Sequence, residues 1–351
     1  MGGDMNSKKA LILAACVAAL VATTGAVQAG APAGAAPAAP AGPRPYSVTA
    51  IPGVVAAGAQ WELIWASTMS ADGFVGSPDG GIWFAQEQSD TIKKLDTSNK
   101  EWIYLTDTHG TGSISVDAKG RMFAAQRTCT DSAKPFYQSC QELTAISQIA
   151  PERRLLANSF KDGRTFGRLN DLIADGKGGA YFTSNGAVNG AWHVTADGDV
   201  TVVEEKDIRS NGITLSPDMK TLYVTNNTGV LAFDVAADGS TSRRRDFAIL
   251  PQGDGGADGM AIDNTGRLYV TTNLGVQVYS PTGQSLGLIP TPRRPISLAF
   301  SGPDKKVLFA PMSGAIGLDG KEWVTPLGVR NVGFSIYRIQ MQAEGFKGRP
   351  K

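Results

Sequence analysis

The chain has 351 residues, and its 33 Lys and Arg against 32 Asp and Glu leave a net charge of +1. This balance excludes an extended basic surface for nucleic acid and an acidic one for cationic partners, so we expect no nucleic-acid partner. The 42 glycines and an aromatic share of 8% are typical of many tight turns between short strands.

Residues 1–29 predict an export signal. Lys8 and Lys9 precede an apolar run over 10–27, and small residues end the segment where a signal peptidase would cut. A membrane anchor is one alternative, but the run is short for a span and is interrupted by threonines. Lipoprotein cleavage before Cys16 is another, with a short apolar stretch in front of it. We therefore expect a periplasmic or secreted protein that has no membrane attachment after cleavage.

Residues 30–45 consist almost entirely of Ala, Pro and Gly. Such a segment buries nothing and has no periodic apolar face, so we expect a flexible linker. The folded domain is expected over 46–345, followed by a charged tail over 346–351.

A short motif recurs six times within the folded domain. In each copy an apolar strand runs through an Asp- or Gly-rich turn into a second strand, and further strand-like segments follow. Copies recur about every 40 to 50 residues, with one longer interval, which is typical of propeller blades with four strands each. The copies align on Phe84, Phe123, Phe182, Val224, Val270 and Phe309.

The two ends of the domain predict how the blades close into a ring. The last copy is followed by GFSIYRIQM, which supplies only a third strand, and QWELIWAS over 60–67 can supply the fourth. A solenoid is the alternative, but a ring closed in this way leaves fewer open sheet edges. The sequence therefore predicts an all-β, six-bladed propeller with four-stranded blades, closed by an N-terminal strand.

The longest interval between copies holds an insertion over 128–150. Because Cys16 leaves with the signal, Cys129 and Cys140 remain as the pair, in a compartment where a disulfide persists. Two free thiols serving a metal are the alternative, although no His lies nearby in the sequence. We expect the disulfide to pin the insertion to itself.

One position of the repeat is rich in oxygen donors. It begins the inner strand of each blade, and inner strands line the channel of a propeller. Asp-Gly and Asn-Gly pairs also form turns, which is the alternative for each residue alone. Carboxylate and amide oxygens at a shared phase instead favour a hard divalent cation such as calcium, magnesium or manganese. The six residues are Asp72, Thr111, Asn170, Asn211, Asp258 and Ile296.

Three stretches, RLNDLIADGKGGAYFT, SNGITLSPDMKTLYVTNN and GGADGMAIDNTGRLYVTTN, resemble the family of senescence marker protein, gluconolactonase and luciferin-regenerating enzyme, which is also described as regucalcin-like. The resemblance covers about residues 60–340. It implies a six-bladed propeller that holds one divalent cation at the channel mouth and hydrolyses lactones. We expect calcium, with magnesium, manganese or zinc as alternatives.

The resemblance also implies roles for particular residues. Asp72, Asn211 and Asp258 would bind the metal, and Arg168 and Asn170 would contact substrate. The family has Glu within Glu-Gly-Pro where this chain has Asp72, whose side chain is one methylene shorter. It has Thr-Asn where this chain has Ile296-Ser297, so nothing polar is carried over to Ile296. A salt bridge is the alternative role for Arg168.

A functional hypothesis follows: a monomeric, metal-dependent hydrolase opens the lactone ring of a sugar or related small molecule. The cation would polarise the carbonyl, and Asp258 would act as general base. The alternatives are a binding or scaffold propeller with a structural cation, and another metal-dependent ester or organophosphate hydrolase. Of the two histidines, His193 is expected to be structural, and His109 is a candidate for the channel rim.

Overall fold

The computed structural model describes residues 43–127, 144–314 and 334–348. The expected signal at 1–29, most of the linker, and both Cys129 and Cys140 lie outside these ranges. In the part that is described, no helix has the length and apolar character needed to span a membrane.

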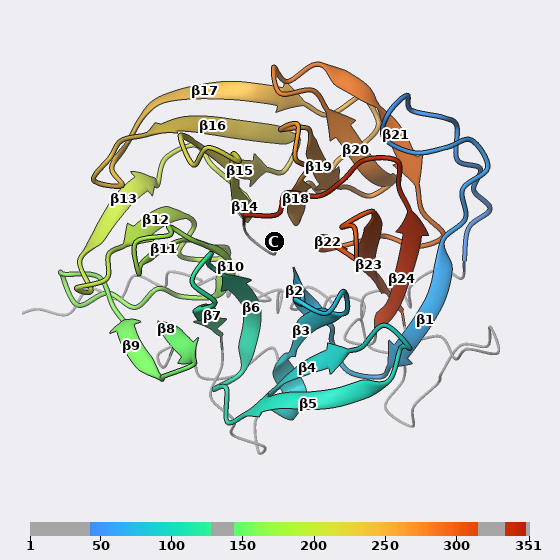
Figure 1. Ribbon diagram of the computed structural model, residues 1–351. Helices are drawn as coiled ribbons and strands as arrows, with labels where there is room; N and C mark the ends of the chain where they lie inside the picture. Colours follow the sequence, from blue (N-terminus) through green and yellow to red (C-terminus); the bar gives the residue numbers. More distant parts are fainter. Residues whose placement is uncertain (1–42, 128–143, 315–333, 349–351) are drawn as a thin grey trace, which may run out of the picture. The chain divides into compact units, whose positions relative to one another are not determined.

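The described strands form six antiparallel sheets of four strands each, arranged around a central axis (Figure 1). This confirms the predicted six-bladed propeller. The inner strands are β2 (Asp72–Gly76), β6 (Thr111–Val116), β10 (Leu169–Ala174), β14 (Ser210–Leu215), β18 (Met260–Ile262) and β22 (Ala299–Ser301). The second strands are β3 (Ile82–Gln86), β7 (Met122–Gln126), β11 (Ala180–Ser184), β15 (Thr221–Asn226), β19 (Leu268–Thr271) and β23 (Val307–Ser313).

The third strands lie farther from the axis: β4 (Thr91–Leu95), β8 (Ala145–Ala150), β12 (Gly190–Val194), β16 (Gly229–Val235), β20 (Gly275–Tyr279) and β24 (Phe334–Gln340). The outer strands are β5 (Glu101–Thr106), β9 (Arg154–Ala157), β13 (Val200–Glu204), β17 (Thr241–Ile249), β21 (Ser285–Pro290) and β1 (Glu62–Ser67). A short 3-10 helix, η1 (Glu87–Ser89), follows β3.

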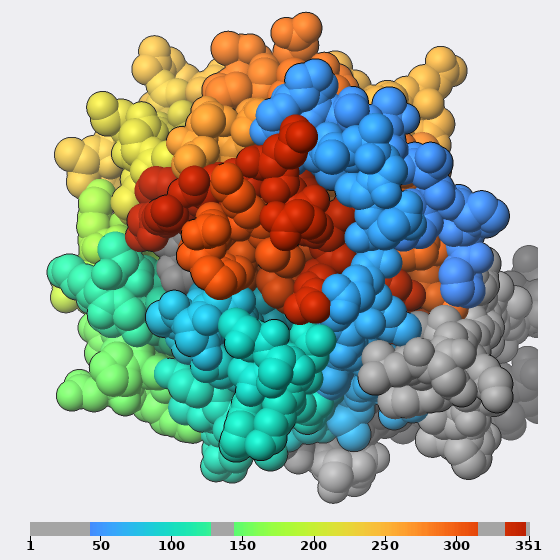
Figure 2. Space-filling model, turned by 45° about the vertical axis from the view of Figure 1, so that its right-hand side comes forward, coloured from blue at the N-terminus to red at the C-terminus, as the bar shows by residue number. Residues whose placement is uncertain are grey.

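The ring closes through the N-terminal strand, as predicted. Strand β1 pairs antiparallel with β24, and β24 continues the sheet of β23 and β22. Glu62 accepts two hydrogen bonds from the guanidinium of Arg338, at 2.8 and 3.0 Å, across this pair. Figure 2 shows the blue N-terminal segment beside the red C-terminal strand. Closure therefore joins strands from the two ends of the domain.

The apolar core is divided among the interfaces between blades. Six clusters of buried side chains lie one between each pair of neighbouring blades. Each blade buries both faces of its sheet in this way, and burying a side chain such as Phe contributes about 1.5–3 kcal/mol. Phe84, Phe123, Phe182, Val224, Val270 and Phe309, on which the copies align, are all buried there.

Aspartates close the turns that connect inner and second strands at one end of the ring. Asp117, Asp175 and Asp263 each accept hydrogen bonds from the backbone N–H groups two and four residues later. Short polar side chains stabilise turns by such local bonds. Because these turns follow the ends of the inner strands, they lie at one end of the ring. The channel mouth lies at the other end, where the inner strands begin.

Both ends of the described chain are bonded to the propeller. Arg44, in the expected linker, donates from Nη1 to the carbonyl of Asn273 at 2.7 Å and from Nε to that of Thr291 at 2.8 Å. Phe346, in the expected tail, donates its N–H to the carbonyl of Ile262 at 3.3 Å. Contacts with the fifth blade thus begin before residue 46 and extend beyond 345.

Candidate functional site

A small hollow of about 10 Å³ lies where the inner strands begin. In the first four blades a β-bulge interrupts the pairing of the inner strand at this point, between Asp72 and Val75 in the first blade, for example. Bulges re-aim side chains, and they are common beside functional sites. The residues lining the hollow are Asp72, Arg127, Asn170, Asp171, Asn211, Asp258, Gly259, Ile296 and Ser297.

Five of the six residues predicted from the repeat phase line this hollow, and Thr111 does not. Thr111 is buried, and its hydroxyl donates to the carbonyl of Thr108 at 2.6 Å. The lining side chain from the second blade is instead Arg127, which follows β7. The phase of the repeat thus identified a lining residue in five blades, whereas in the second blade the Arg127 side chain takes this place.

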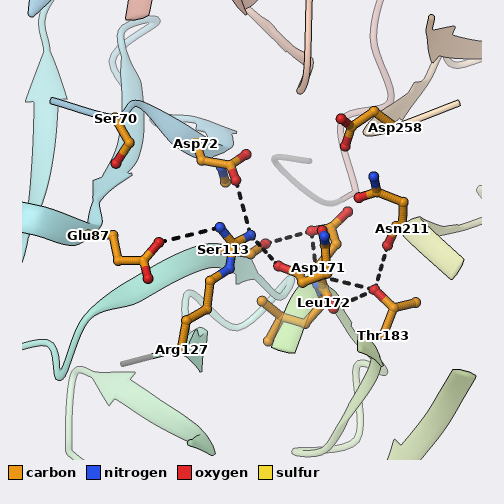
Figure 3. A network of polar contacts seen from close by, with 12 residues as sticks. Ser70, Asp72, Glu87, Ser113, Arg127, Asp171, Leu172, Thr183, Asn211 and Asp258 are labelled. Atoms are coloured by element: carbon orange, nitrogen blue, oxygen red, sulfur yellow. Dashed lines mark hydrogen bonds and ion pairs between the residues drawn. The ribbon is translucent and has the colours of Figure 1, made fainter. Parts of the chain in front are cut away.

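Arg127 joins the first three blades. Its Nη2 donates to Asp72 Oδ2 at 3.0 Å and also to the backbone carbonyl of Asn170. Its Nη1 lies 3.6 Å from Glu87 Oε2. Figure 3 shows the guanidinium between these two carboxylates. Because both acids and the guanidinium are largely buried, the pairing compensates charges that would otherwise be costly to desolvate.

Burial shifts the acids of this cluster toward the protonated form. It raises the pKa of Glu87 to about 7, against the opposing effect of Arg127. It also raises the pKa of Asp72, again opposed by Arg127 and by the N–H of Gly73. The mouth therefore holds carboxyl groups whose ionisation depends on the guanidinium beside them.

Asn211 and Asp258 face the hollow from the fourth and fifth blades (Figure 3). Asn211 Oδ1 is buried and accepts no hydrogen bond from any residue that the structure describes, although its backbone carbonyl accepts one from Thr183. Asp258 Oδ2 accepts from Arg294 at 3.2 Å. Burial raises the pKa of Asp258 to about 7, with Arg294 opposing the shift. A buried amide oxygen without a partner is costly, and a water molecule, a cation or a ligand can satisfy it.

Asp171 is a buried acid that links three blades. Its Oδ1 accepts from the hydroxyl of Ser113 at 2.5 Å and from the N–H of Leu172 at 2.9 Å. Its Oδ2 accepts from the N–H of Ile213 at 3.2 Å. The carboxylate therefore ties the inner strands of the second, third and fourth blades together beneath the mouth.

Sequence reasoning missed Glu87, Arg127 and Asp171, although each left a signal. Four of the six copies have Gly directly after the phased residue, and the third has Asp171. Glu87 and Arg127 directly follow β3 and β7, where the next two blades have Asn after their second strands. A charged residue in one copy, where the other copies have Gly or Asn, therefore indicates a buried charge that is paired with another side chain.

The remaining candidates lie in different places. Arg168, just before β10, is exposed, and the charges of Glu87, Asp72 and Asp258 act on it. His109 is exposed in the loop before β6. His193 is buried at the opposite end, with Nε2 2.9 Å from Asp175 Oδ2. Arg168 is therefore the member of this group with an electrostatic link to the mouth acids.

The donors at the mouth fit a divalent cation in part. Asn211 Oδ1 has no partner in the described part of the chain, Asp258 supplies a carboxylate, and such oxygens suit hard cations. Asp72 is already paired with Arg127. Among the described residues, no group of three His, Cys, Asp or Glu side chains could hold a metal. Any cation site here therefore depends on the amide oxygen as well as on carboxylates.

These features define a class: six-bladed propellers with an oxygen-rich hollow at the channel mouth. Residues 106–311 match the family described as the SMP-30/Gluconolactonase/LRE-like region, and the chain belongs to this family. The match confirms the resemblance identified from the sequence motifs.

Three relatives are moderately similar to this chain in sequence. A gluconolactonase of Zymomonas mobilis is 28% identical over 225 residues, which cover 57% of this chain and 60% of that protein. A pentonolactonase of Haloferax volcanii is 29% identical over 51% of this chain and 64% of its own length. Regucalcin of Xenopus laevis is 31% identical over 72% of this chain and 89% of regucalcin. The chain thus spans less than two thirds of the two lactonases.

Solved structures share the fold. A gluconolactonase from Xanthomonas campestris superposes with a TM-score of 0.65 at 21% identity, covering 88% of this chain and 98% of that one. A luciferin-regenerating enzyme superposes with a TM-score of 0.63 at 19% identity, covering 83% and 98%.

Proposed function

We propose that this protein hydrolyses the lactone of a sugar or a related small molecule, with a divalent cation at the channel mouth. The observation that carries the proposal is the convergence of the unpartnered Asn211 Oδ1 and the Asp258 carboxylate on one hollow. The names gluconolactonase and pentonolactonase among its relatives support a lactone as substrate.

The residues have separate tasks in this reaction. A bound cation, for which calcium suits the oxygen donors, would polarise the lactone carbonyl and offset the charge that develops on its oxygen. Asp258 accepts a proton from the attacking water, which is the task of a general base. Arg168 orients the lactone through its hydroxyl or carbonyl oxygens with fixed N–H donors.

The test is lactone hydrolysis by the purified protein. The acid that is released is measured, with gluconolactone as the first substrate. Chelator treatment should abolish activity and added calcium or manganese should restore it. Asp258→Asn should lower kcat/KM by about 100-fold or more. The matched control is Asp197→Asn, an exposed aspartate in the turn between β12 and β13. Equal activity of Asp258→Asn and the control would contradict the assignment of the base.

A substrate panel separates the alternatives. Aryl esters and a phosphotriester are assayed beside the lactones, because the same oxyanion chemistry would serve them. Faster hydrolysis of an aryl ester or of the phosphotriester than of the lactones would make that compound class the proposed substrate. Hydrolysis of none of these compounds would contradict an enzymatic role and favour a binding propeller.

We further propose that the protein is exported as a monomer with a Cys129–Cys140 disulfide, as expected from the sequence. Expression of the full chain in a bacterium with a periplasm should give a periplasmic product that begins at Gly30. Intact mass before and after reduction reports cleavage and the disulfide, and light scattering reports the monomer. Retention of residues 1–29 in the product would contradict export with cleavage.

A further inference from the structure

Asp72 has both carboxylate oxygens engaged within the protein. Oδ1 accepts from the N–H of Gly73 at 2.8 Å, and Oδ2 accepts from Arg127 Nη2 at 3.0 Å. The bond to Arg127 is charge-assisted and therefore among the stronger kinds of hydrogen bond. The first-blade acid thus already has a cationic partner.

Arg127 is held in place by more than Asp72. Its Nη2 also donates to the carbonyl of Asn170, and its Nη1 faces Glu87. Its side chain crosses the backbone of β6 at Gly112, where an added Cβ would lie 2.1 Å from Nε. Contacts from three blades therefore fix the position of the guanidinium at the mouth.

The oxygens of Asn211 and Asp258, on the opposite side of the hollow, have fewer or weaker partners within the protein. Within the described ranges, Asn211 Oδ1 has no hydrogen-bond partner. Asp258 pairs with Arg294 at 3.2 Å, but the Arg294 side chain is 44% exposed and can turn into solvent. The Arg127 side chain is only 8% exposed and has no such freedom. A divalent cation can therefore displace Arg294 from Asp258 far more easily than it can displace Arg127 from Asp72.

We propose that Arg127 is the permanent counter-charge of Asp72, so that the cation site of this chain is built on Asn211 and Asp258 and excludes the first-blade carboxylate. The inference rests on the cation of the proposed function. A guanidinium beside the site repels a second cation and occupies one of the acids that would hold it. Arg127 thereby weakens cation binding.

The test is isothermal titration of the cation-depleted full-length protein with calcium chloride and with manganese chloride. Its central variant is Arg127→Gln/Glu87→Gln, which removes one buried positive and one buried negative charge together. Net charge stays the same while Asp72 is released, so this variant should bind about tenfold more tightly. Asp258→Asn should lose binding in every background.

Asp72→Asn supplies the decisive comparison. In the wild type it should weaken binding by less than about threefold, and in the Arg127→Gln/Glu87→Gln background by about tenfold or more. An equal loss in both backgrounds would overturn the proposal, because Asp72 would then be a ligand beside Arg127. Unchanged or weaker cation binding by Arg127→Gln/Glu87→Gln would also overturn it.

Gly112→Ala is a second route that alters no charged residue. The added methyl group displaces Arg127, so affinity should change in the same direction as in Arg127→Gln/Glu87→Gln. Thermal melts of the cation-free variants identify folded samples. The wild type should bind and the released variants should bind more tightly. Binding by the released variants alone would show that the site needs Asp72, and this result, like binding by none of the proteins, would overturn the proposal. Lactone hydrolysis by the untreated wild type is measured in parallel and tests the proposed function separately.

Discussion

The side chain of Arg127 lies directly against Gly112, a residue of inner strand β6. A Cβ added at Gly112 would lie 2.1 Å from Nε and 2.3 Å from Cζ of Arg127, closer than real contacts allow. The missing side chain at Gly112 is therefore what lets Arg127 reach from the end of β7 to Asp72 and Glu87.

Gly112→Ala should lower the free energy of unfolding by about 1–3 kcal/mol, because the guanidinium must leave two carboxylates that it compensates. Urea denaturation measures the change. Gly255→Ala is the matched control, since a Cβ there meets only Asn273 Nδ2 at 3.8 Å. Equal stability of the two variants would show that Arg127 can move without cost.

Asp171→Ala should destabilise the propeller by about 2–4 kcal/mol. The substitution leaves the buried N–H of Ile213 and the hydroxyl of Ser113 without their acceptor, and each such group costs about 1–3 kcal/mol. Asp171→Asn retains one acceptor oxygen and should lose less. Urea denaturation is again the measurement, with exposed Asp197→Ala as control. A loss no greater than that of the control would refute the linking role.

Closure of the ring should depend on Trp65. This side chain is buried between the last and first blades and meets Phe84 edge to face, with ring centroids 5.1 Å apart. Trp65→Ala should cost about 3–5 kcal/mol through lost burial and the cavity left behind. Trp102→Ala, at a side chain that is 48% exposed on β5, should cost less than about 1 kcal/mol. Thermal and urea unfolding of the two variants measure the difference.

Arg168→Gln should raise KM for the lactone by about tenfold and leave kcat within about threefold, because a substrate contact made in ground and transition states alike changes KM alone. Its guanidinium makes no hydrogen bond to the residues that the structure describes, which leaves its donors available to substrate. Arg154→Gln, at the opposite end of the ring, is the control. A fall in kcat at unchanged KM would instead place Arg168 in the transition state.

Much of the site could be predicted because the repeat has a fixed phase. Residues at one position of each blade converge on the channel, so Asp72, Asn170, Asn211 and Asp258 could be grouped without knowledge of their distances. Thr111 does not follow this rule, because in the second blade the side chain of Arg127, which follows β7, lines the mouth instead. Arg127 lies outside that phase, and only the absence of a side chain at Gly112 lets it reach the mouth.

The sequence by itself determined the propeller, its closure by an N-terminal strand and the family, because these follow from periodic patterns that every blade repeats. The tertiary structure alone decided the pairing of charges at the mouth. Asp72, Glu87 and Arg127 are brought together by long-range packing of two blades, and burial there makes their pairing decisive for the free energy. A linear pattern records residue types and spacing, whereas the partner of a buried charge is set by which side chains share its small volume.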